Sequence, residues 1–288
     1  MSNIFLQILL GGVLTGFVYV LISLGLTLIF GVMDICNFAH GDFLTIAMYA
    51  AFCFSLWFGL DPIISLPIVT LLVGLFGAIV YWLLIRHVLN SSGMAQIFVT
   101  FGLMIFIRGM MQALFSANYR KITNPLLEGS FTFGSIALSK PQVVASIGAI
   151  TATLIIYLFI TKTRTGWALQ AVSENRQAAS LMGIPVQKMF ILAWAIGAAC
   201  VGIAGGLMAE YYYIYPEVGA LFGSLSFITV ALGGFGSIPG VFIAGLLIGI
   251  TEVVGGFYLS PAYKYLLVYS LYFVVIVIRP QGILGKKA

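Results

Sequence analysis

Charged side chains are scarce in this chain of 288 residues. Only 7% of the residues are Asp, Glu, Lys or Arg, whereas a soluble domain contains about 25%, and 61% are hydrophobic. This composition excludes a soluble enzyme, a disordered protein and a nucleic-acid-binding protein, although the formal net charge is +5. In such an apolar chain, the excess of basic residues is typical of the positive-inside bias of proteins that span a bilayer.

Residues that could perform catalysis or hold a metal are also few. The chain has two histidines, on different apolar segments, and three cysteines that lie far apart, without a spacing typical of a metal site or a disulfide. It has no GxxxxGK[ST] phosphate-binding loop. We therefore expect no catalytic residue, no metal site and no cofactor in this chain, which disfavours an integral-membrane enzyme. If ATP drives a transport process here, another subunit must hydrolyse it.

The apolar residues form nine segments. Most are near the length of about 20 residues that a helix needs to cross a bilayer, and they lack the strict alternation of a membrane β-barrel. We predict an all-α polytopic membrane protein with about eight or nine transmembrane helices in one transmembrane domain, residues 1–288. The seventh segment is short and flanked by glycines, so a re-entrant segment is the alternative there. The segments are 4–30, 40–58, 62–85, 94–115, 141–161, 187–209, 219–235, 238–257 and 261–278.

The basic residues between these segments are unevenly divided between the two sides. Loops rich in Lys and Arg stay in the cytoplasm, so the richer side predicts a cytoplasmic C-terminus and an external N-terminus. The cytoplasmic group is Arg86, Lys162, Arg164, Arg176, Lys188, Arg279, Lys286 and Lys287, and the external group is Arg120, Lys121, Lys140 and Lys264.

The first polar interruption lies in residues 31–42, where Asn37, His40 and Asp42 occur in an otherwise apolar region. Polar groups at membrane depth are costly unless they are satisfied. One interpretation is a plain connection between helices, in which Asn37 or Asp42 caps the second helix and His40 lies at the interface. The alternative is a broken helix beside a translocation pathway, which makes these three residues pathway candidates.

Residues 165–185 are the only stretch on the cytoplasmic side that is long enough for a helix of its own. Thr165 is suited to cap its start, and Gly183 and Pro185 are suited to end it. One interpretation is an amphipathic helix that lies on the membrane surface. The other is a helix that docks in a groove of a cytoplasmic partner.

The third interruption, residues 231–241, holds four glycines and a proline within eight positions. Such a sequence cannot continue a regular helix, and a tight turn between two spans is the simplest interpretation. Irregular backbone at membrane depth is also tolerated where it lines a cavity. On that interpretation Gly233, Gly234, Gly236 and Ser237 are further pathway candidates.

Arg108 and Glu252 are charged residues inside the predicted spans 94–115 and 238–257. Each lies fourteen positions after the inner end of its span, about 21 Å along a helix, so we expect them at similar depth. The hypothesis is an intramembrane ion pair between them. The alternative is that both side chains reach toward the outer interface.

Five motifs occur in an order and at topological positions that together are typical of one known family. They are Gly25-Leu-Thr-Leu-Ile-Phe-Gly31, Asn37-Phe-Ala-His-Gly-Asp42, Ala178-Ala-Ser-Leu-Met-Gly-Ile184, Leu232-Gly-Gly-Phe-Gly-Ser-Ile-Pro-Gly240 and Arg279-Pro-Gln-Gly-Ile-Leu-Gly285. Over residues 11–285 the chain resembles the Liv-type permease subunits of bacterial ABC importers for branched-chain amino acids, a family that also includes urea and short-amide permeases.

The resemblance implies a subunit of an ATP-driven importer in the bacterial inner membrane that works by alternating access. The expected partners are two ATP-binding subunits, which hold ATP and Mg²⁺, a second permease subunit and a periplasmic solute-binding protein. The chain resembles the shorter permease of such systems, which favours a heterodimer over a homodimer. The expected substrate is a branched-chain amino acid; urea or a short amide is the alternative, as is a stand-alone channel or secondary transporter.

The resemblance also implies roles for two of the segments. The segment 165–185 would be the coupling helix that docks on an ATPase subunit, and residues 37–42 would lie beside the central pathway. The residues expected to couple to the ATPase are Trp167, Glu174, Asn175, Arg176, Ala179, Met182 and Gly183.

Overall fold

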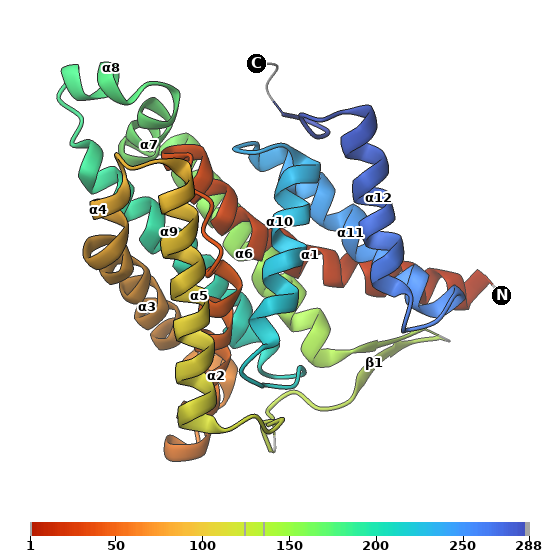
Figure 1. Ribbon diagram of the computed structural model, residues 1–288. Helices are drawn as coiled ribbons and strands as arrows, with labels where there is room; N and C mark the ends of the chain where they lie inside the picture. The colour runs from red at the N-terminus through yellow and green to blue at the C-terminus, as the bar shows by residue number, and fades with distance from the viewer. Residues whose placement is uncertain (1, 124, 135, 286–288) are drawn as a thin grey trace.

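The computed structural model describes residues 2–123, 125–134 and 136–285, and most of them are helical (Figure 1). Within these residues, seven helices are long and apolar enough to cross a membrane, and two shorter apolar helices accompany them. The predicted all-α polytopic membrane fold is therefore confirmed. The long helices are α1 (Ser2–Met33), α2 (His40–Phe58), α3 (Pro62–Val80) continuing through the π-helical turn η1 (Tyr81–Ile85) into α4 (Arg86–Val88), α5 (Gly93–Phe115), α6 (Lys140–Lys162), α9 (Val186–Met208) and α11 (Ile238–Tyr258), and the shorter ones are α10 (Val218–Gly233) and α12 (Lys264–Ile278).

Helix α10 corresponds to the predicted seventh segment. It has 16 residues, about 24 Å at 1.5 Å per residue, which is less than the hydrocarbon thickness of about 30 Å. Most of its residues are buried, and it packs against α1, α2 and α11. A helix surrounded by protein does not need to match the bilayer thickness, because its ends are covered by neighbouring chain rather than by lipid.

Glycines allow close helix packing at two contacts in the bundle. Gly16 of α1 faces Gly249 of α11, and a Cβ atom on Gly249 would overlap the backbone of Gly16. Gly41 at the start of α2 faces Gly219 of α10, and a Cβ atom on Gly41 would overlap the Gly219 carbonyl oxygen. Small residues of this kind let helices approach closely inside membranes. The first turn of α2 is therefore held directly against α10.

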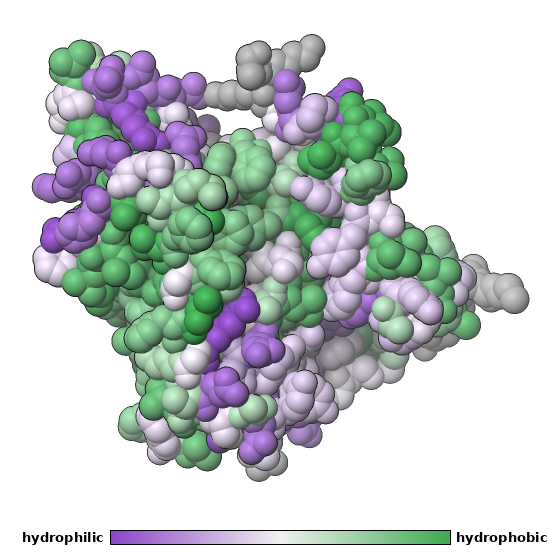
Figure 2. All heavy atoms as spheres, in the orientation of Figure 1, coloured by the Kyte–Doolittle hydropathy of each residue, from purple (hydrophilic) through white to green (hydrophobic). Residues whose placement is uncertain are grey.

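Different structures cover the two ends of the bundle. One end carries α4, the short helices α7 (Arg164–Glu174) and α8 (Arg176–Leu181), and the segment after α12 (Figure 1). The other carries an antiparallel hairpin of β1 (Ser130–Phe133) and β2 (Ile136–Ser139). Figure 2 shows hydrophilic side chains gathered over α7 and α8 and toward the hairpin end, with hydrophobic side chains between them. The α7–α8 end is the one that the basic residues predict to be cytoplasmic.

Two carboxylates hold the loop that leads to the hairpin. The Leu126 N–H donates to Oδ2 of Asp61 at 2.7 Å, and the Leu127 N–H donates to Oε1 of Glu210 at 3.1 Å. Burial is the main cause that raises the pKa of Glu210. The hydrogen bond from the Leu127 N–H lowers this pKa, and the nearby charge of Asp61 raises it, but both effects are smaller than that of burial. Each of these contacts joins residues that are far apart in the chain, so no local sequence pattern indicates them.

Candidate functional site

The chain between α1 and α2 turns back into the bundle. Asp34 follows α1 with a left-handed φ of +54°, and residues 35–39 then lead into the bundle to the start of α2. The Nε2 atom of His40 lies 2.9 Å from the Ile22 carbonyl oxygen, and the ring also faces Gly25. Helix α2 therefore begins beside the interior of α1 rather than beside its end. This geometry favours the broken-helix interpretation over a plain connection at the membrane surface.

The polar side chains of this segment are fully buried and only partly satisfied. Oδ1 of Asn37 accepts a hydrogen bond from the Ala39 N–H at 3.1 Å, and His40 donates through Nε2 to the Ile22 carbonyl. Nδ2 of Asn37 and Nδ1 of His40 have no hydrogen-bond partner in the part of the chain that the structure describes. Ala39 occupies the N-cap of α2 without any side-chain hydrogen bond, so neither Asn37 nor Asp42 is the cap.

Asp42, in the first turn of α2, forms an ion pair with Arg108 of α5. Nε of Arg108 donates to Oδ1 of Asp42 at 2.7 Å, and Nη2 donates to Oδ2 at 3.3 Å. The side chain of Asp42 is 1% exposed and that of Arg108 is 28% exposed. Two turns earlier on α5, the Thr100 hydroxyl donates to the Cys36 carbonyl oxygen at 3.1 Å. Helix α5 is thus attached both to the segment 35–39 and to the start of α2.

The predicted ion pair between Arg108 and Glu252 is wrong. Glu252 of α11 lies 2.7 Å from Nζ of Lys264 on α12 and accepts a hydrogen bond from the Tyr19 hydroxyl of α1. Helix α5 packs against α2, whereas α11 packs against α1, α10 and α12. Arg108 and Glu252 were expected at equal depth, but the helices that carry them are not neighbours. Each of the two residues instead has its charged partner on a helix that packs against its own.

The segment 165–185 forms two helices instead of the single helix expected. Thr163, not Thr165, caps the first, because its Oγ1 accepts a backbone N–H at 3.0 Å. Asn175 adopts an extended conformation and caps the second helix by accepting the Ala178 N–H at 2.9 Å. Asparagine is favoured at such N-cap positions and disfavoured inside helices. The break between α7 and α8 therefore follows from the side chain at position 175.

The end of α8 presents an exposed apolar tip. The side chains of Leu181 and Met182 are 89% and 82% exposed, and Gly183 turns the chain with a φ of +80°. Ala179 is buried, so it supports the tip from inside and is not part of its surface. Leu181 was not among the predicted coupling residues. Its position next to Met182 at the end of a glycine-terminated helix is the signal that could have identified it.

Arg176 connects α8 to the end of α1. Its Nη2 lies 2.8 Å from Oδ2 of Asp34, with side-chain exposures of 40% for Arg176 and 77% for Asp34. The guanidinium also lies 5.5 Å from the ring centroid of Phe190. Trp167 takes no part in these contacts. Its Nε1 donates instead to the Thr161 carbonyl oxygen at the end of α6, at 2.8 Å. The α7–α8 segment therefore touches the chain at the point where it enters residues 35–39.

The glycine-rich loop lies at the same end of the bundle as α7 and α8 (Figure 1). Helix α10 ends at Gly233, and Gly234 and Gly236 adopt positive φ angles of +100° and +77°. Ser237 caps α11 by accepting the Gly240 N–H at 3.2 Å. The tight-turn interpretation of this loop agrees with these conformations.

The segment after α12 closes this turn. The N–H groups of Ile283 and Leu284 donate to the carbonyl oxygens of Leu232 and Gly233 at 2.8 and 3.1 Å. These carbonyls belong to the last turn of α10 and would otherwise lack a helical partner. The sequence motif that begins at Arg279 thus has a structural role that its sequence did not reveal.

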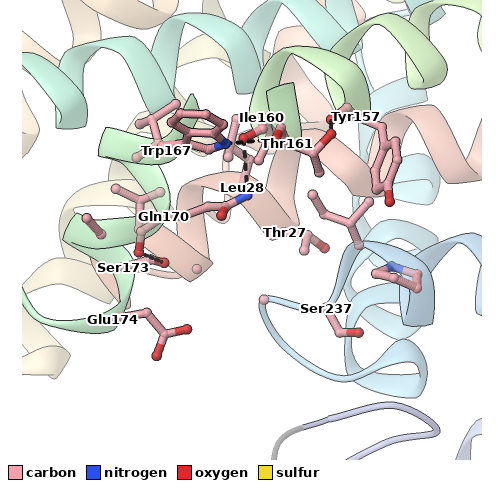
Figure 3. Close-up of a pocket in the computed structure, with 17 residues that line it drawn as sticks. Thr27, Leu28, Tyr157, Ile160, Thr161, Trp167, Gln170, Ser173, Glu174 and Ser237 are labelled. Carbon is pink, nitrogen blue, oxygen red and sulfur yellow. Dashed lines mark hydrogen bonds between the residues drawn. The ribbon is translucent and has the colours of Figure 1, made fainter. Parts of the chain in front are cut away.

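A cavity of about 510 Å³ separates α7 from the glycine-rich loop (Figure 3). Glu174 and Ser237 line it from opposite sides, and Thr27 of α1 and Tyr157 of α6 are among its other polar lining residues. A neighbouring cavity of about 540 Å³ shares Glu174 and Ser237 and reaches Asp34. The structure therefore groups the glycine-rich loop with the expected coupling residues.

Comparison with known proteins shows similarity over nearly the whole chain. Residues 8–276 match the family described as branched-chain amino acid transport system / permease component. LivH of Escherichia coli K12, a high-affinity branched-chain amino acid transport system permease protein, is 33% identical over 98% of this chain and 96% of its own length. LivM of the same strain, which has the same description, is 25% identical over 93% of this chain and 68% of its own length.

A solved structure shares the fold. It is PsaBC from Streptococcus pneumoniae in complex with Fab, which matches with a TM-score of 0.53 and covers 98% of this chain and 97% of the matched one. The sequence identity is 15%, so this likeness concerns the arrangement of helices alone.

Proposed function

The chain belongs to the family of branched-chain amino acid permease components of ABC transporters, and we propose that it is the membrane subunit of an ATP-driven importer of branched-chain amino acids. The observation that carries the proposal is the α7–α8 segment. It presents the apolar residues Leu181 and Met182 at the polar end of a membrane bundle. Through Arg176 it also contacts the chain that leads to α2.

In this proposal, the α7–α8 segment docks on an ATPase subunit. The chain contains no phosphate-binding loop, so two partner subunits bind ATP and Mg²⁺ and this chain holds no cofactor. Leu181 and Met182 insert into an apolar groove of the partner, as helical recognition segments do. When the partner closes on nucleotide, α8 moves, and the Arg176–Asp34 contact transmits the movement to residues 35–39.

The translocation pathway is proposed to follow the buried polar segment. Asn37, His40 and Asp42 lie along it, and rearrangement of the helices around this segment opens it to one side of the membrane at a time. Gly233, Gly234, Gly236 and Ser237 are assigned instead to the coupling region, because Gly236 and Ser237 share a cavity with Glu174.

The further partners follow from the family. We place the chain in a bacterial inner membrane, with a periplasmic solute-binding protein that delivers the amino acid. We also propose a heterodimer with a second permease subunit, because Escherichia coli has two distinct related permease proteins, LivH and LivM, with the same description. The greater identity to LivH supports a LivH-like position for this chain in that heterodimer.

Purification of the tagged chain from its native host, with identification of the proteins that accompany it, tests the proposal. We expect stoichiometric ATP-binding subunits, and ATP-dependent leucine uptake after reconstitution with the binding protein. The variant Leu181→Asp should lose the ATP-binding subunits, whereas Lys121→Asp, a change at an exposed position of the opposite end, should retain them. A chain that purifies alone and moves solute without nucleotide would indicate a channel or secondary transporter. Transport of urea instead of leucine would indicate the amide branch of the family.

A further inference from the structure

Arg108 has hydrogen-bonding capacity that the ion pair does not use. A guanidinium carries five N–H groups, and two of those on Arg108 donate to Asp42 among the residues that the structure describes. Asp42 is almost completely covered, while 28% of the Arg108 side chain remains exposed. A charged group within a spanning helix is costly and usually functional. The exposed side of this guanidinium therefore requires an explanation beyond the pair itself.

The other intramembrane charge cluster provides a contrast. Both carboxylate oxygens of Glu252 have partners, Nζ of Lys264 and the hydroxyl of Tyr19. Lys264 also lies 4.6 Å from the ring centroid of Tyr265. This cluster joins α1, α11 and α12 and resembles a structural clamp. The Lys264 side chain is as exposed as that of Arg108, 30% against 28%. An ammonium is a point charge, however, whereas the planar guanidinium of Arg108 presents paired N–H groups that match a carboxylate.

The contact between α2 and α10 next to Asp42 is apolar and aromatic. Gly41, next to Asp42, packs closely against Gly223 of α10. Phe38 and Phe227, which come from the two chain segments that flank this contact, stack with their ring centroids 5.1 Å apart, and both are partly exposed. Figure 2 shows a hydrophilic patch that interrupts the hydrophobic surface near α5 and α10. A fixed cation beside an apolar surface suits a ligand with a carboxylate and an apolar side chain.

We propose that Arg108 binds the carboxylate of the transported amino acid and that Asp42 is the positioning residue that orients the guanidinium. This inference rests on the proposed function and adds the chemical group that the pathway recognises. Guanidinium and carboxylate form paired, charge-assisted hydrogen bonds, so the unused N–H groups of Arg108 can bind a substrate without breaking the pair with Asp42. The site selects a carboxylate, and it gives no such advantage to urea or short amides.

The first test measures ligand binding to the permease–ATPase complex without its binding protein. Three compounds share the same branched apolar chain: leucine, 4-methylpentanoate, which lacks the amino group, and isoamylamine, which lacks the carboxylate. We expect leucine and 4-methylpentanoate to raise the melting temperature of the complex, and isoamylamine to leave it unchanged. Equal stabilisation by isoamylamine and leucine would overturn the proposal, and this comparison requires no variant to fold.

The second test measures ATP-driven leucine uptake by the reconstituted complex with its binding protein. The variant Asp42→Asn with Arg108→Gln keeps a hydrogen-bonded amide pair but removes both charges. We expect its uptake to fall roughly 10- to 100-fold, the effect of losing one charged hydrogen-bond partner. The matched control, Glu252→Gln with Lys264→Gln, neutralises the structural cluster and should keep the preference for carboxylate ligands.

The two tests separate this inference from the proposed function. Wild-type uptake in the Asp42–Arg108 variant would show that the pair is only structural, while the importer itself stands. Carboxylate-dependent stabilisation without ATP-driven uptake in the wild type would refute the importer and leave the carboxylate site supported.

Discussion

Two aspartates eight residues apart each pair with an arginine, but in different surroundings. Asp34 and Arg176 meet at 2.8 Å at the α7–α8 end, where both side chains are exposed. Asp42 and Arg108 meet at 2.7 Å inside the bundle, where Asp42 is 1% exposed. The residues between the two aspartates turn from the end of α1 to the start of α2. The same chemistry is therefore present at both ends of one short segment, once in water and once in protein.

The difference shows how surroundings decide what an ion pair can do. Exposed pairs contribute about 0–1 kcal/mol and are screened by salt. Removal of one partner from a buried pair costs roughly 3–5 kcal/mol, because the remaining charge is uncompensated. The Asp34–Arg176 pair is thus suited to break and form during a transport cycle, whereas the Asp42–Arg108 pair is suited to hold two helices together.

The largest expected effect comes from breaking the buried pair. Asp42→Ala leaves Arg108 without its carboxylate, and we expect it to lower the free energy of unfolding by about 3 kcal/mol, the lower end of the buried range since Arg108 is partly exposed. Denaturant unfolding in detergent measures the change. Asp34→Asn is the matched control, and an equal loss in both variants would remove the distinction between the pairs.

A second prediction disturbs the position of the buried pair without touching its charges. Gly41→Ala places a methyl group against the Gly219 carbonyl oxygen of α10, and we expect a loss of about 1–3 kcal/mol from overpacking. Gly102→Ala on α5 is the control, because a Cβ atom there meets open space. Thermal unfolding compares the two. A tolerated Gly41→Ala would show that α2 and α10 separate readily at this contact.

A third prediction concerns the exposed pair. Asp34→Asn should change the free energy of unfolding by less than about 1 kcal/mol, because asparagine also tolerates the left-handed conformation at this position. We nevertheless expect less leucine uptake per ATP hydrolysed. The double variant with Arg176→Gln should be no worse than either single one, as expected for residues that act through one contact. Unchanged coupling in Asp34→Asn would exclude this contact as the transmission route.

The smallest expected effect concerns a buried carboxylate without an arginine. Burial raises the pKa of Glu210, and its Oε2 has no hydrogen-bond partner among the described residues. The folded state therefore holds this proton more tightly than the unfolded chain, so stability should fall as the pH rises from the ordinary glutamate pKa to the raised one. Melting curves across this pH range should show a flatter dependence for Glu210→Gln. An identical slope in both proteins would contradict the assignment.

The sequence predicted the helices well because each span is a continuous apolar run. It also indicated interruptions at 31–42, 165–185 and 231–241, and in each of these segments the structure ends one helix and begins another. Pairwise contacts were not predictable in the same way. The depth of Arg108 and Glu252 could be counted along a helix, but which helices are neighbours depends on packing, such as the Gly41–Gly219 contact, that no local pattern encodes.

Local chemistry explains the remaining differences. The cap at Thr163 and the break at Asn175 depend on which of several suitable polar residues adopts the capping conformation. A single sequence offers both Thr163 and Thr165 for the first role. The exposed tip at Leu181 and the partnership of Asp34 with Arg176 depend on the bend between α7 and α8, and this bend was not expected.

The hydrogen bonds from Ile283 and Leu284 to the end of α10 also impose an order on folding. The turn at Gly233 and Gly234 comes before α11 and α12 in the chain, yet the donors that close it come after both helices. The turn therefore cannot be completed until α11 and α12 have formed and have brought the chain back to this end of the bundle.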